Sequence, residues 1–314
     1  MMVLMSPRFN ARPKPESNYF NQLPTMKLST KPLISVYMPV FNGNGYLSRA
    51  IESILNQTFS NFEFIIVDDG STDNSWNTIK KYAKKDSRIV ALKNNINKGV
   101  SYSANLAINQ SRGQFVARMD ADDISFPDRL AKQLEFLKSN KNVVACGTQC
   151  LVIDQLENVI GLKSFPTSRS TLREMIFYAI PMQQPSVMVN RKLLPKKFTW
   201  YFDKRPFGED VGFIFRLLQH GEIANLDENL LCYRDTPNSL TKRKLRSTFN
   251  STILSRAQAV KEGYRPSMLA IYYNFIQIIA VYLFPSKLIF TVWNILRGIN
   301  KVDLNNYKVP SISC

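Results

Sequence analysis

Residues 33–71, LISVYMPVFNGNGYLSRAIESILNQTFSNFEFIIVDDGS, contain the pattern that decides the fold. The run 33–42 is apolar and rich in residues that favour β-structure, which is typical of a buried strand. Residues 45–57 then place apolar side chains at helical spacing, and residues 62–71 form a second apolar run that ends in two aspartates. Strand, helix and strand in this order predict two parallel strands joined by a helix.

The alternation of strands and helices continues along the chain. Further helices are expected over 71–85, 100–111 and 129–140, and further strands over 88–94 and 113–123. The pattern predicts an α/β fold with a mostly parallel central sheet flanked by helices. In such sheets, ligands bind beyond the carboxyl ends of the strands. Two of the expected strand ends carry carboxylates: Asp68, Asp69, Asp120, Asp122 and Asp123.

The composition is that of a globular protein with an excess of positive charge. The 314 residues are 45% hydrophobic and 21% charged, with a formal net charge of +17. Residues 235–314 carry 11 basic and three acidic side chains, so the last quarter of the chain contributes +8. Such an excess suits a nucleic acid, an anionic membrane surface or a solvated face. The four cysteines form no zinc-type pair of pairs and no secretory signal is evident, which indicates reduced thiols and a cytoplasmic protein.

Three segments are expected. Residues 1–31 contain four prolines and no sustained periodicity, which predicts a disordered N-terminal extension, and residues 32–240 hold the α/β pattern. Residues 241–314 are basic and apolar, with a helix expected over 241–263 and a nearly apolar run over 268–284. A membrane span needs about 20 apolar residues, so a helix or hairpin lying in the membrane interface is favoured over a span. A helix that simply packs on the domain is the structural alternative.

The pair Asp120 and Asp122 lies at a strand end, where a spacing of two puts both side chains on one side of the pleat. Two carboxylates so placed make half a site for Mn²⁺ or Mg²⁺, which substrate phosphates complete. The D-x-D pattern by itself is common in loops. The segment DDGSTDNS, residues 68–75, is by itself also typical of a turn followed by a helix cap. Glu209 and Asp210 fall in the first turn of an expected helix, where acids also suit the helix dipole.

Several motifs resemble those of the family-2 glycosyltransferases, which are inverting enzymes with the GT-A fold. The resemblance runs through residues 33–75, 97–108 and 113–137, continues in 182–194, 207–221 and 230–241, and covers roughly 32–240. It implies transfer of a sugar from a nucleotide-sugar donor, usually a UDP-sugar, to an acceptor hydroxyl. The type it implies is the nonprocessive one that builds bacterial surface polysaccharides, because the Q-x-x-R-W motif of processive synthases is absent.

The resemblance also implies roles for individual residues. Donor-binding roles fall to a set at the strand ends and in the NKG segment: Pro39, Asp68, Asp69, Lys98 and Asp120. Asp122 would contact the divalent cation, with Asp120 beside it and closer to the ribose. Asp210 would be the general base that takes the proton of the acceptor hydroxyl, with Glu209 and Arg234 supporting the site. Inversion requires one such base and no protein nucleophile.

The chain departs from the family pattern at two histidine positions. Asp235 and Thr236 follow the Tyr233–Arg234 pair, where many members carry a metal- or diphosphate-binding histidine, so cation binding would rest more on Asp122. Gln184 stands where many relatives have a histidine before the PSVM segment, which indicates a different acceptor preference. His220, the only histidine, is expected at a helix end in a surface role.

The sequence therefore predicts a glycosyltransferase that works on the inner face of the cell membrane. A lipid-linked or surface-polysaccharide precursor is the expected acceptor, because the basic C-terminal segment also contains apolar and aromatic residues. The alternative is a nucleotide-sugar-binding assembly partner without catalysis. A nucleotidyltransferase lacks support because MPVFNGNG is no glycine-rich phosphate loop, and nucleic-acid binding ranks last because the positive charge lies beside an apolar segment.

Overall fold

The structure is a computed structural model that describes residues 31–202, 209–236, 245–285, 289 and 307–311. The expected N-terminal extension, apart from its last residue, and most of 288–296 lie outside the described residues. The strands are β1 Ile34–Val40, β2 Phe62–Asp68, β3 Ile89–Lys93, β4 Phe115–Arg118, β5 Ile124–Ser125, β6 Val143–Ile153, β7 Val159–Lys163, β8 Met188–Asn190 and β9 Glu222–Arg234. The α-helices are α1 Leu47–Leu55, α2 Ser75–Lys85, α3 Val100–Gln110, α4 Arg129–Ser139, α5 Arg169–Met175, α6 Glu209–Leu218, α8 Leu245–Lys261 and α9 Met268–Leu283. Two short 3₁₀ helices, η1 Gln184–Ser186 and η2 Arg191–Leu193, flank β8.

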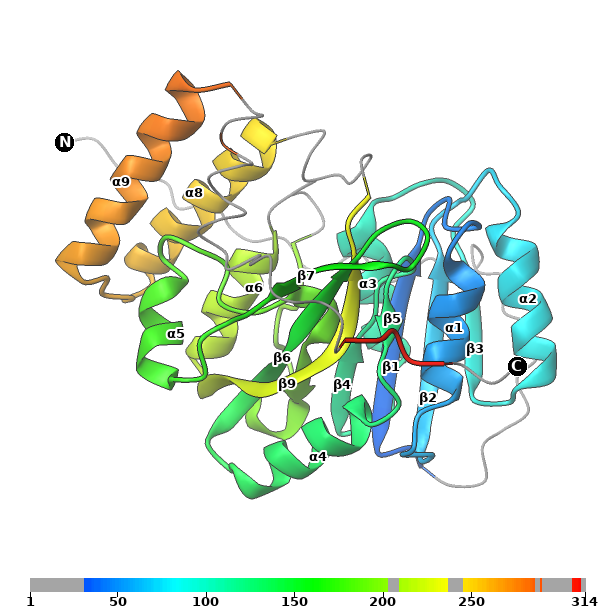
Figure 1. The fold of residues 1–314 in the computed structure, drawn as a ribbon. Helices are drawn as coiled ribbons and strands as arrows, with labels where there is room; N and C mark the ends of the chain where they lie inside the picture. The colour runs from blue at the N-terminus through cyan, green and yellow to red at the C-terminus, as the bar shows by residue number, and fades with distance from the viewer. Residues whose placement is uncertain (1–30, 203–208, 237–244, 286–288, 290–306, 312–314) are drawn as a thin grey trace, which may run out of the picture.

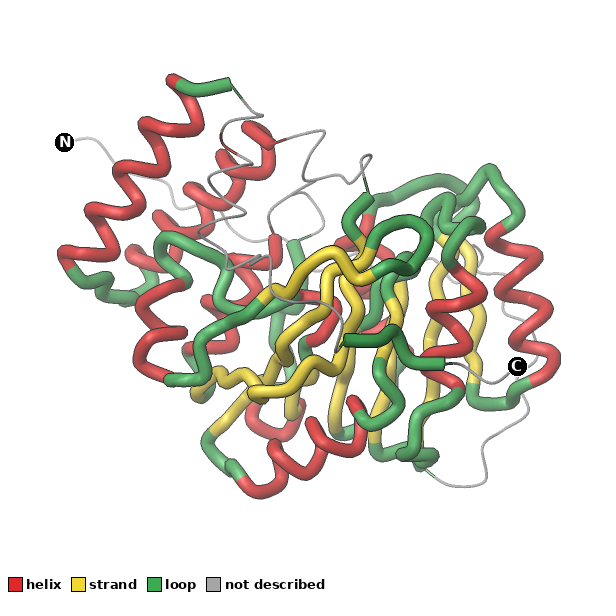
Figure 2. The backbone as a smooth tube through the Cα atoms, viewed as in Figure 1, coloured by secondary structure: helices red, strands yellow, loops and turns green. Residues whose placement is uncertain are grey.

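The strands, yellow in Figure 2, form one mixed sheet. Their order is β3-β2-β1-β4-β8-β6-β9-β5, with β7 paired to β6. β1, β2, β3 and β4 are mutually parallel, as the alternation of strands and helices predicts. The second half departs from the expected parallel arrangement because β8 lies antiparallel to both β4 and β6. β6 turns directly into β7 through a tight hairpin, and β5 pairs antiparallel with β9. The α/β class is confirmed, and the sheet is mixed because β5, β7 and β8 run antiparallel to their neighbours.

The sheet is buried on both faces, which explains why its strands read as continuous apolar runs. Alternate residues of β1 enter different cores: Val36 and Met38 pack in one, and Tyr37 packs in the other. Helices α1, α2 and α4 cover the first face, and α3, α5 and α6 cover the second (Figure 1). The two layers hold β1, β2 and β4 in a fixed register, so their carboxyl ends meet at one edge.

Gly70 lets the loop after β3 approach the end of β2. Its φ is +70°, and a Cβ at this position would lie 2.5 Å from the backbone carbonyl carbon of Ile96. A left-handed backbone in so narrow a space admits only glycine. The NKG segment is thereby held against Asp69.

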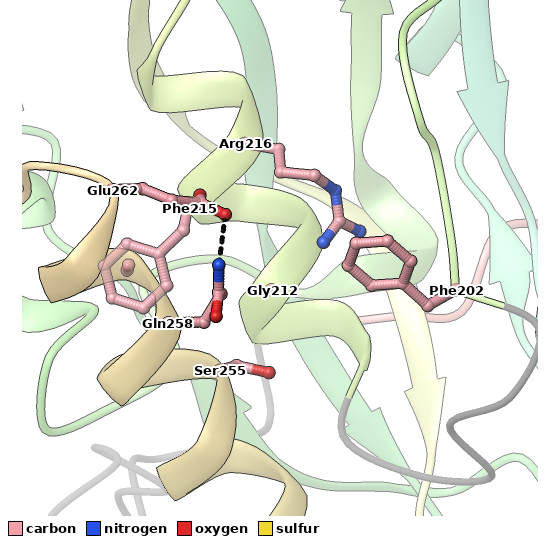
Figure 3. Close-up of a pocket in the computed structure, with 8 residues that line it drawn as sticks. Phe202, Gly212, Phe215, Arg216, Ser255, Gln258 and Glu262 are labelled. Atoms are coloured by element: carbon pink, nitrogen blue, oxygen red, sulfur yellow. Dashed lines mark hydrogen bonds between the residues drawn. The ribbon is translucent and has the colours of Figure 1, made fainter. Parts of the chain in front are cut away.

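The C-terminal helices pack on the layer of helices that covers the second face of the sheet. α8 lies against α6, and α9 lies beside α8 at the end of the molecule farthest from α2 (Figure 1). Between α6 and α8 is a crevice of about 10 Å³, where Arg216 lies over the Phe202 ring and Gln258 donates to Glu262 (Figure 3). That volume holds about one water molecule, so the crevice is too small for a nucleotide.

Residues at the extreme C-terminus return to the sheet. Tyr307 and Val309 pack against a cluster that contains Ile124, Leu151 and Cys232. This cluster supports the loop that follows β4, so part of the segment 241–314 contacts the α/β domain directly. Among the described residues, no helix is long and apolar enough to cross a membrane.

Candidate active site

The first acidic pair, Asp68 and Asp69, lies at the end of β2, where Pro39 of β1 is the neighbour of Val67. Both oxygens of Asp69 are used within the protein. Oδ1 accepts from the backbone N–H of Lys98 at 2.9 Å and from Asn94 Nδ2 at 2.7 Å, and Oδ2 accepts from the Gly99 N–H at 2.8 Å. Asp69 therefore fixes the loop 94–99.

Asp68 is fully buried and its Oδ2 has no hydrogen bond among the described residues. Lys93 Nζ lies 3.9 Å from that oxygen, and Ser71 N–H donates to Oδ1 at 3.4 Å. Burial raises the pKa of Asp68, and its hydrogen bonds with Ser71 and the charge of Lys93 oppose this. A buried acceptor without a partner at a strand end suits a hydrogen-bond donor supplied by a ligand.

Lys98 extends from the fixed loop as an exposed cation. Its Nζ lies 3.3 Å from the Tyr102 hydroxyl and 4.6 Å from the centre of that ring, so α3 orients it. An ammonium group held at the rim of the strand ends suits an anionic ligand.

The D-x-D carboxylate and the aspartate of α6 are brought together by Arg118. This arginine ends β4, and its guanidinium is nearly inaccessible to solvent. Nε donates to Asp120 Oδ1 at 2.9 Å, and Nη1 donates to Asp210 Oδ1 at 3.2 Å. Asp120 and Asp210, which are 90 positions apart in the sequence, therefore share the Arg118 guanidinium. The Asp210 side chain remains 41% accessible to solvent.

Several opposing influences set the ionisation of Asp210. Its partial burial raises its pKa, the Arg118 charge lowers it, and the Asp120 carboxylate raises it again. The position of Asp210 in the first turn of α6 adds the field of the helix N-terminus, which favours the anion. Glu209 begins the same helix, but its side chain lies outside the described residues.

Asp122 differs from its neighbours because no other described residue forms a hydrogen bond with its carboxylate. Burial and the nearby Asp120 carboxylate raise the pKa of Asp122 to about 6. Asp123 is fully buried behind it, accepts from the Arg234 N–H at 2.9 Å through Oδ1, and leaves Oδ2 without a partner among the described residues. Burial and the two neighbouring carboxylates raise the pKa of Asp123 as well. Crowded carboxylates with unused lone pairs fit a divalent cation between them.

The described residues contain no group of three or more His, Cys, Asp or Glu side chains that would enclose a metal ion. Mg²⁺ and Mn²⁺ bound together with a diphosphate do not need such a group, because one or two carboxylates and the phosphate oxygens suffice. The oxygen donors of Asp120 and Asp122 fit a cation of this kind.

Arg234 ends β9 and is buried, where it holds the acidic loop in place. Its Nε donates to the backbone carbonyl of Asp122 at 2.7 Å, and Nη2 donates to Glu157 Oε1 at 3.2 Å. Its guanidinium also lies 4.3 Å from the centre of the Tyr46 ring. The supporting role expected of Arg234 is therefore structural: it ties the D-x-D loop to the β6–β7 hairpin and to the start of α1.

Sequence reasoning missed Arg118 and the hydroxyl network behind it. Tyr201 OH lies 2.8 Å from Tyr37 OH, accepts from Gln184 Nε2 at 2.9 Å and lies 3.5 Å from Arg118 Nη1. The Tyr201 ring also stacks on Phe213 of α6, so the network supports the helix that carries Asp210. The strand period of two offered a signal for Arg118, which shares its parity with Asp120 and Asp122. Tyr201 lies in an irregular segment and offered none.

Comparison with known proteins identifies the family. The model of glycosyl transferase family 2 matches residues 35–194. An uncharacterized glycosyltransferase of Methanocaldococcus jannaschii is 36% identical over 210 residues, which are 65% of this chain and 71% of that protein. The Escherichia coli enzyme WfaP, a UDP-Glc:α-D-GlcNAc-diphosphoundecaprenol β-1,3-glucosyltransferase, is 37% identical over 109 residues, 35% of this chain and 43% of the enzyme.

The fold is also that of a solved structure with bound UDP. The crystal structure of Staphylococcus aureus TarS residues 1–349 in complex with UDP superposes with a TM-score of 0.60 at 18% identity, covering 86% of this chain and 75% of TarS 1–349. At that identity the likeness concerns the fold, which is of the GT-A type. The family match covers half of the chain and includes the ends of β2 and β4. The chain therefore belongs to glycosyl transferase family 2 and is a transferase.

Proposed function

We propose that the protein transfers a single sugar from a UDP-sugar to an acceptor hydroxyl with inversion at the anomeric carbon, and that Asp210 is the general base. The observation that carries the proposal is the Arg118 bridge between Asp120 and Asp210. Arg118 donates to both carboxylates, and this supports a site in which Asp120 serves the donor and Asp210 serves the acceptor. One ionised carboxylate facing the acceptor is what an inverting displacement requires.

Each residue has a distinct task in this proposal. Asp68 accepts a hydrogen bond from the nucleoside through its unpartnered Oδ2, Asp69 fixes the loop 94–99, and Lys98 attracts the diphosphate. Asp122, with Asp120 beside it, holds a divalent cation, and when bound this cation stabilises the charge that develops on the departing diphosphate. Asp210 accepts the proton of the acceptor hydroxyl while the hydroxyl oxygen attacks the anomeric carbon from the opposite side.

The proposed acceptor is a lipid-linked precursor of a surface polysaccharide, at the cytoplasmic face of the cell membrane. The name of WfaP specifies a diphosphoundecaprenol-linked acceptor, which supports this class of substrate. The three described cysteines, Cys146, Cys150 and Cys232, are free and buried, in keeping with a reducing compartment.

A thermal-shift titration tests the proposal before any acceptor is known. Purified protein is titrated with UDP, GDP, CDP and dTDP, each with and without Mn²⁺. A ligand that binds only the folded state stabilises it by about 2.7 kcal/mol at 100 times its Kd, so a Mn²⁺-dependent rise with UDP is expected. A larger rise with another nucleotide would overturn the UDP assignment. A rise without sugar transfer to any acceptor would favour the assembly partner without catalysis.

Replacing Arg118 tests the bridge itself. In Arg118→Met the Asp210 carboxylate loses the charge that lowers its pKa, so the low-pH limb of kcat moves to higher pH and kcat at pH 7 falls about tenfold or more. Arg118→Lys keeps the charge but cannot donate from two fixed nitrogens, so its profile is expected between those of Arg118→Met and the original enzyme. The measurement is kcat against pH for all three proteins, with melting temperatures as a folding control. A loss of kcat without a shifted profile would assign Arg118 a role in folding alone.

A further inference from the structure

α9 turns two polar side chains towards the protein and exposes most of its large apolar side chains, which is the reverse of an ordinary surface helix. Its inward face is formed by Ala270, Asn274, Gln277 and Val281, at positions that recur every three or four residues. The two polar members of this face contact Arg256 of α8, whose Nη1 donates to Asn274 Oδ1 at 2.6 Å and to Gln277 Oε1 at 3.1 Å. The polar residues that interrupt the apolar run 268–284 thus point into the protein.

Arg256 is itself buried, and burial lowers its pKa to about 10. A buried guanidinium is costly unless hydrogen-bond acceptors surround it, and α9 supplies two of them. This contact fixes the rotation of α9 about its axis. Val281 and Ile278 pack with apolar residues of α8, and most of the other large apolar side chains of α9 are exposed.

The outward face of α9 is wide, apolar and uncharged. Met268 is 81% exposed, Phe275 is 59% exposed and Leu283 is 74% exposed. The other exposed large hydrophobic residues of the helix and its C-cap are Leu269, Ile271, Tyr272, Tyr273, Ile276, Ile279, Tyr282 and Phe284. Single exposed apolar residues are normal on a soluble protein, whereas a continuous face of this kind marks an interaction surface.

The charged residues around α9 indicate what kind of partner its outward face binds. Lys261 and Arg265 are exposed just before α9, with one exposed acid, Glu262, between them, and the 16 residues of α9 include no charge. Residues 235–314 as a whole carry 11 basic and three acidic side chains. A helix with an apolar face, aromatic side chains and flanking basic residues is suited to the interface of an anionic bilayer. At about 1.5 Å per residue, α9 is also shorter than the roughly 30 Å hydrocarbon core, which favours lying along the membrane over crossing it.

We propose that α9 docks on an anionic membrane surface through its outward face, with Arg256 holding its polar face against the protein. The proposal extends the function above to the surface at which a lipid-linked acceptor is presented. It is tested by binding alone, so its failure leaves the transfer reaction untouched, and a failure of the transfer assignment leaves it standing.

Vesicle flotation with the full-length protein tests the proposal. Vesicles of phosphatidylcholine alone and with about 30% phosphatidylglycerol are compared. We expect binding to the anionic vesicles and at least tenfold weaker binding to the neutral ones. Phe275→Ser/Leu283→Ser removes two large apolar groups from the outward face and is expected to weaken anionic-vesicle binding at least tenfold.

A matched double variant controls for a general loss of surface hydrophobicity. Leu156 is 82% exposed and Ile160 is 43% exposed in the β6–β7 hairpin, so Leu156→Ser/Ile160→Ser removes a comparable amount of apolar surface elsewhere. Its vesicle binding is expected within twofold of the original protein. Both double variants are expected to keep the original melting temperature, because the altered side chains are exposed.

Three outcomes would overturn the proposal. Equal loss of binding in both double variants would show that vesicle binding is unspecific. If the protein binds neither type of vesicle, the outward face of α9 is not a membrane-docking surface. A concentration-dependent dimer in sedimentation velocity that Phe275→Ser/Leu283→Ser abolishes, without vesicle binding, would assign the face to a second copy of the chain.

Discussion

Asp210→Asn is expected to reduce turnover by about 100-fold to 10,000-fold, the range attributed to a positioned general base. Asparagine keeps the shape of the side chain and an oxygen that accepts from Arg118, so the bridge seen at 3.2 Å can persist. What it loses is the ability to take a proton from the acceptor hydroxyl. Binding of the donor nucleotide is expected to stay within about threefold, because the proposed donor residues lie at the ends of β1, β2 and β4 and in the loop 94–99.

The measurement is an initial-rate assay with a saturating donor, together with nucleotide binding by thermal shift. Asp227→Asn provides a matched control, since Asp227 is an exposed aspartate of β9 that contributes no contact to the site. Its turnover is expected to be unchanged. Full activity of Asp210→Asn would refute the assignment of the base, and an equal loss of nucleotide binding would reduce Asp210 to a structural role.

The pH dependence of the original enzyme follows from the same residue. Burial raises the pKa of Asp210 above its ordinary value, although Arg118 lowers it in part. The base is active only when ionised, so kcat rises with pH as Asp210 loses its proton and reaches a plateau above that pKa.

The strand ends could be predicted from the sequence because they depend on local pattern and on one general property of parallel sheets. The runs before Asp68 and Asp120 are mostly apolar and β-rich, and parallel strands must end at a common edge. The sequence contains no comparable pattern from which the strand order in the second half of the sheet could be predicted. β8 contains only three residues, and its antiparallel pairing with β4 depends on the packing of an irregular segment.

The division of labour among the charged residues could not be predicted in the same way. Asp69 was expected to bind the donor and Arg234 to support the site, and in the structure their polar atoms hold loops together over long stretches of sequence. Arg118 shares a strand with Asp120, but its second partner is contributed by α6. Such pairings depend on how distant elements pack, and local periodicity contains no information on that.

The orientation of α9 gives the clearest example. Asn274 and Gln277 appear in the sequence as interruptions of an apolar run, and their number alone argues against a membrane span. The buried Arg256 of a neighbouring helix shows that both point inward, and most of the large apolar side chains of α9 are exposed on the other side.

Asp122→Ala is expected to abolish the Mn²⁺-dependent part of nucleotide binding. The carboxylate has no hydrogen bond with another described residue, and burial with Asp120 beside it raises its pKa to about 6. A cation and a proton compete for the same oxygens, so in the original protein the affinity for Mn²⁺ and UDP falls as the pH decreases through about 6. In Asp122→Ala this pH dependence is expected to disappear together with the Mn²⁺-dependent thermal shift.

The control is Asp128→Ala, because Asp128 is exposed and its side chain makes no capping hydrogen bond to α4. This variant should retain the full Mn²⁺-dependent shift. If Asp122→Ala also retains it, the cation is held elsewhere and the D-x-D assignment is wrong.

Without cation or nucleotide, the same substitution is expected to raise the melting temperature at pH 7.5. The pKa of Asp122 is about 6 in the folded protein and close to 3.8 in the unfolded chain, so the folded state binds the proton more readily between these values. The free energy of unfolding therefore decreases as the pH rises through this window, and above it the ionised carboxylate destabilises the fold. Alanine removes that cost, so its advantage should be present at pH 7.5 and diminish as the pH falls towards 4. A melting temperature lowered at pH 7.5 would mean that the Asp122 carboxylate stabilises the unliganded fold, and the crowding of carboxylates would then no longer support a cation site.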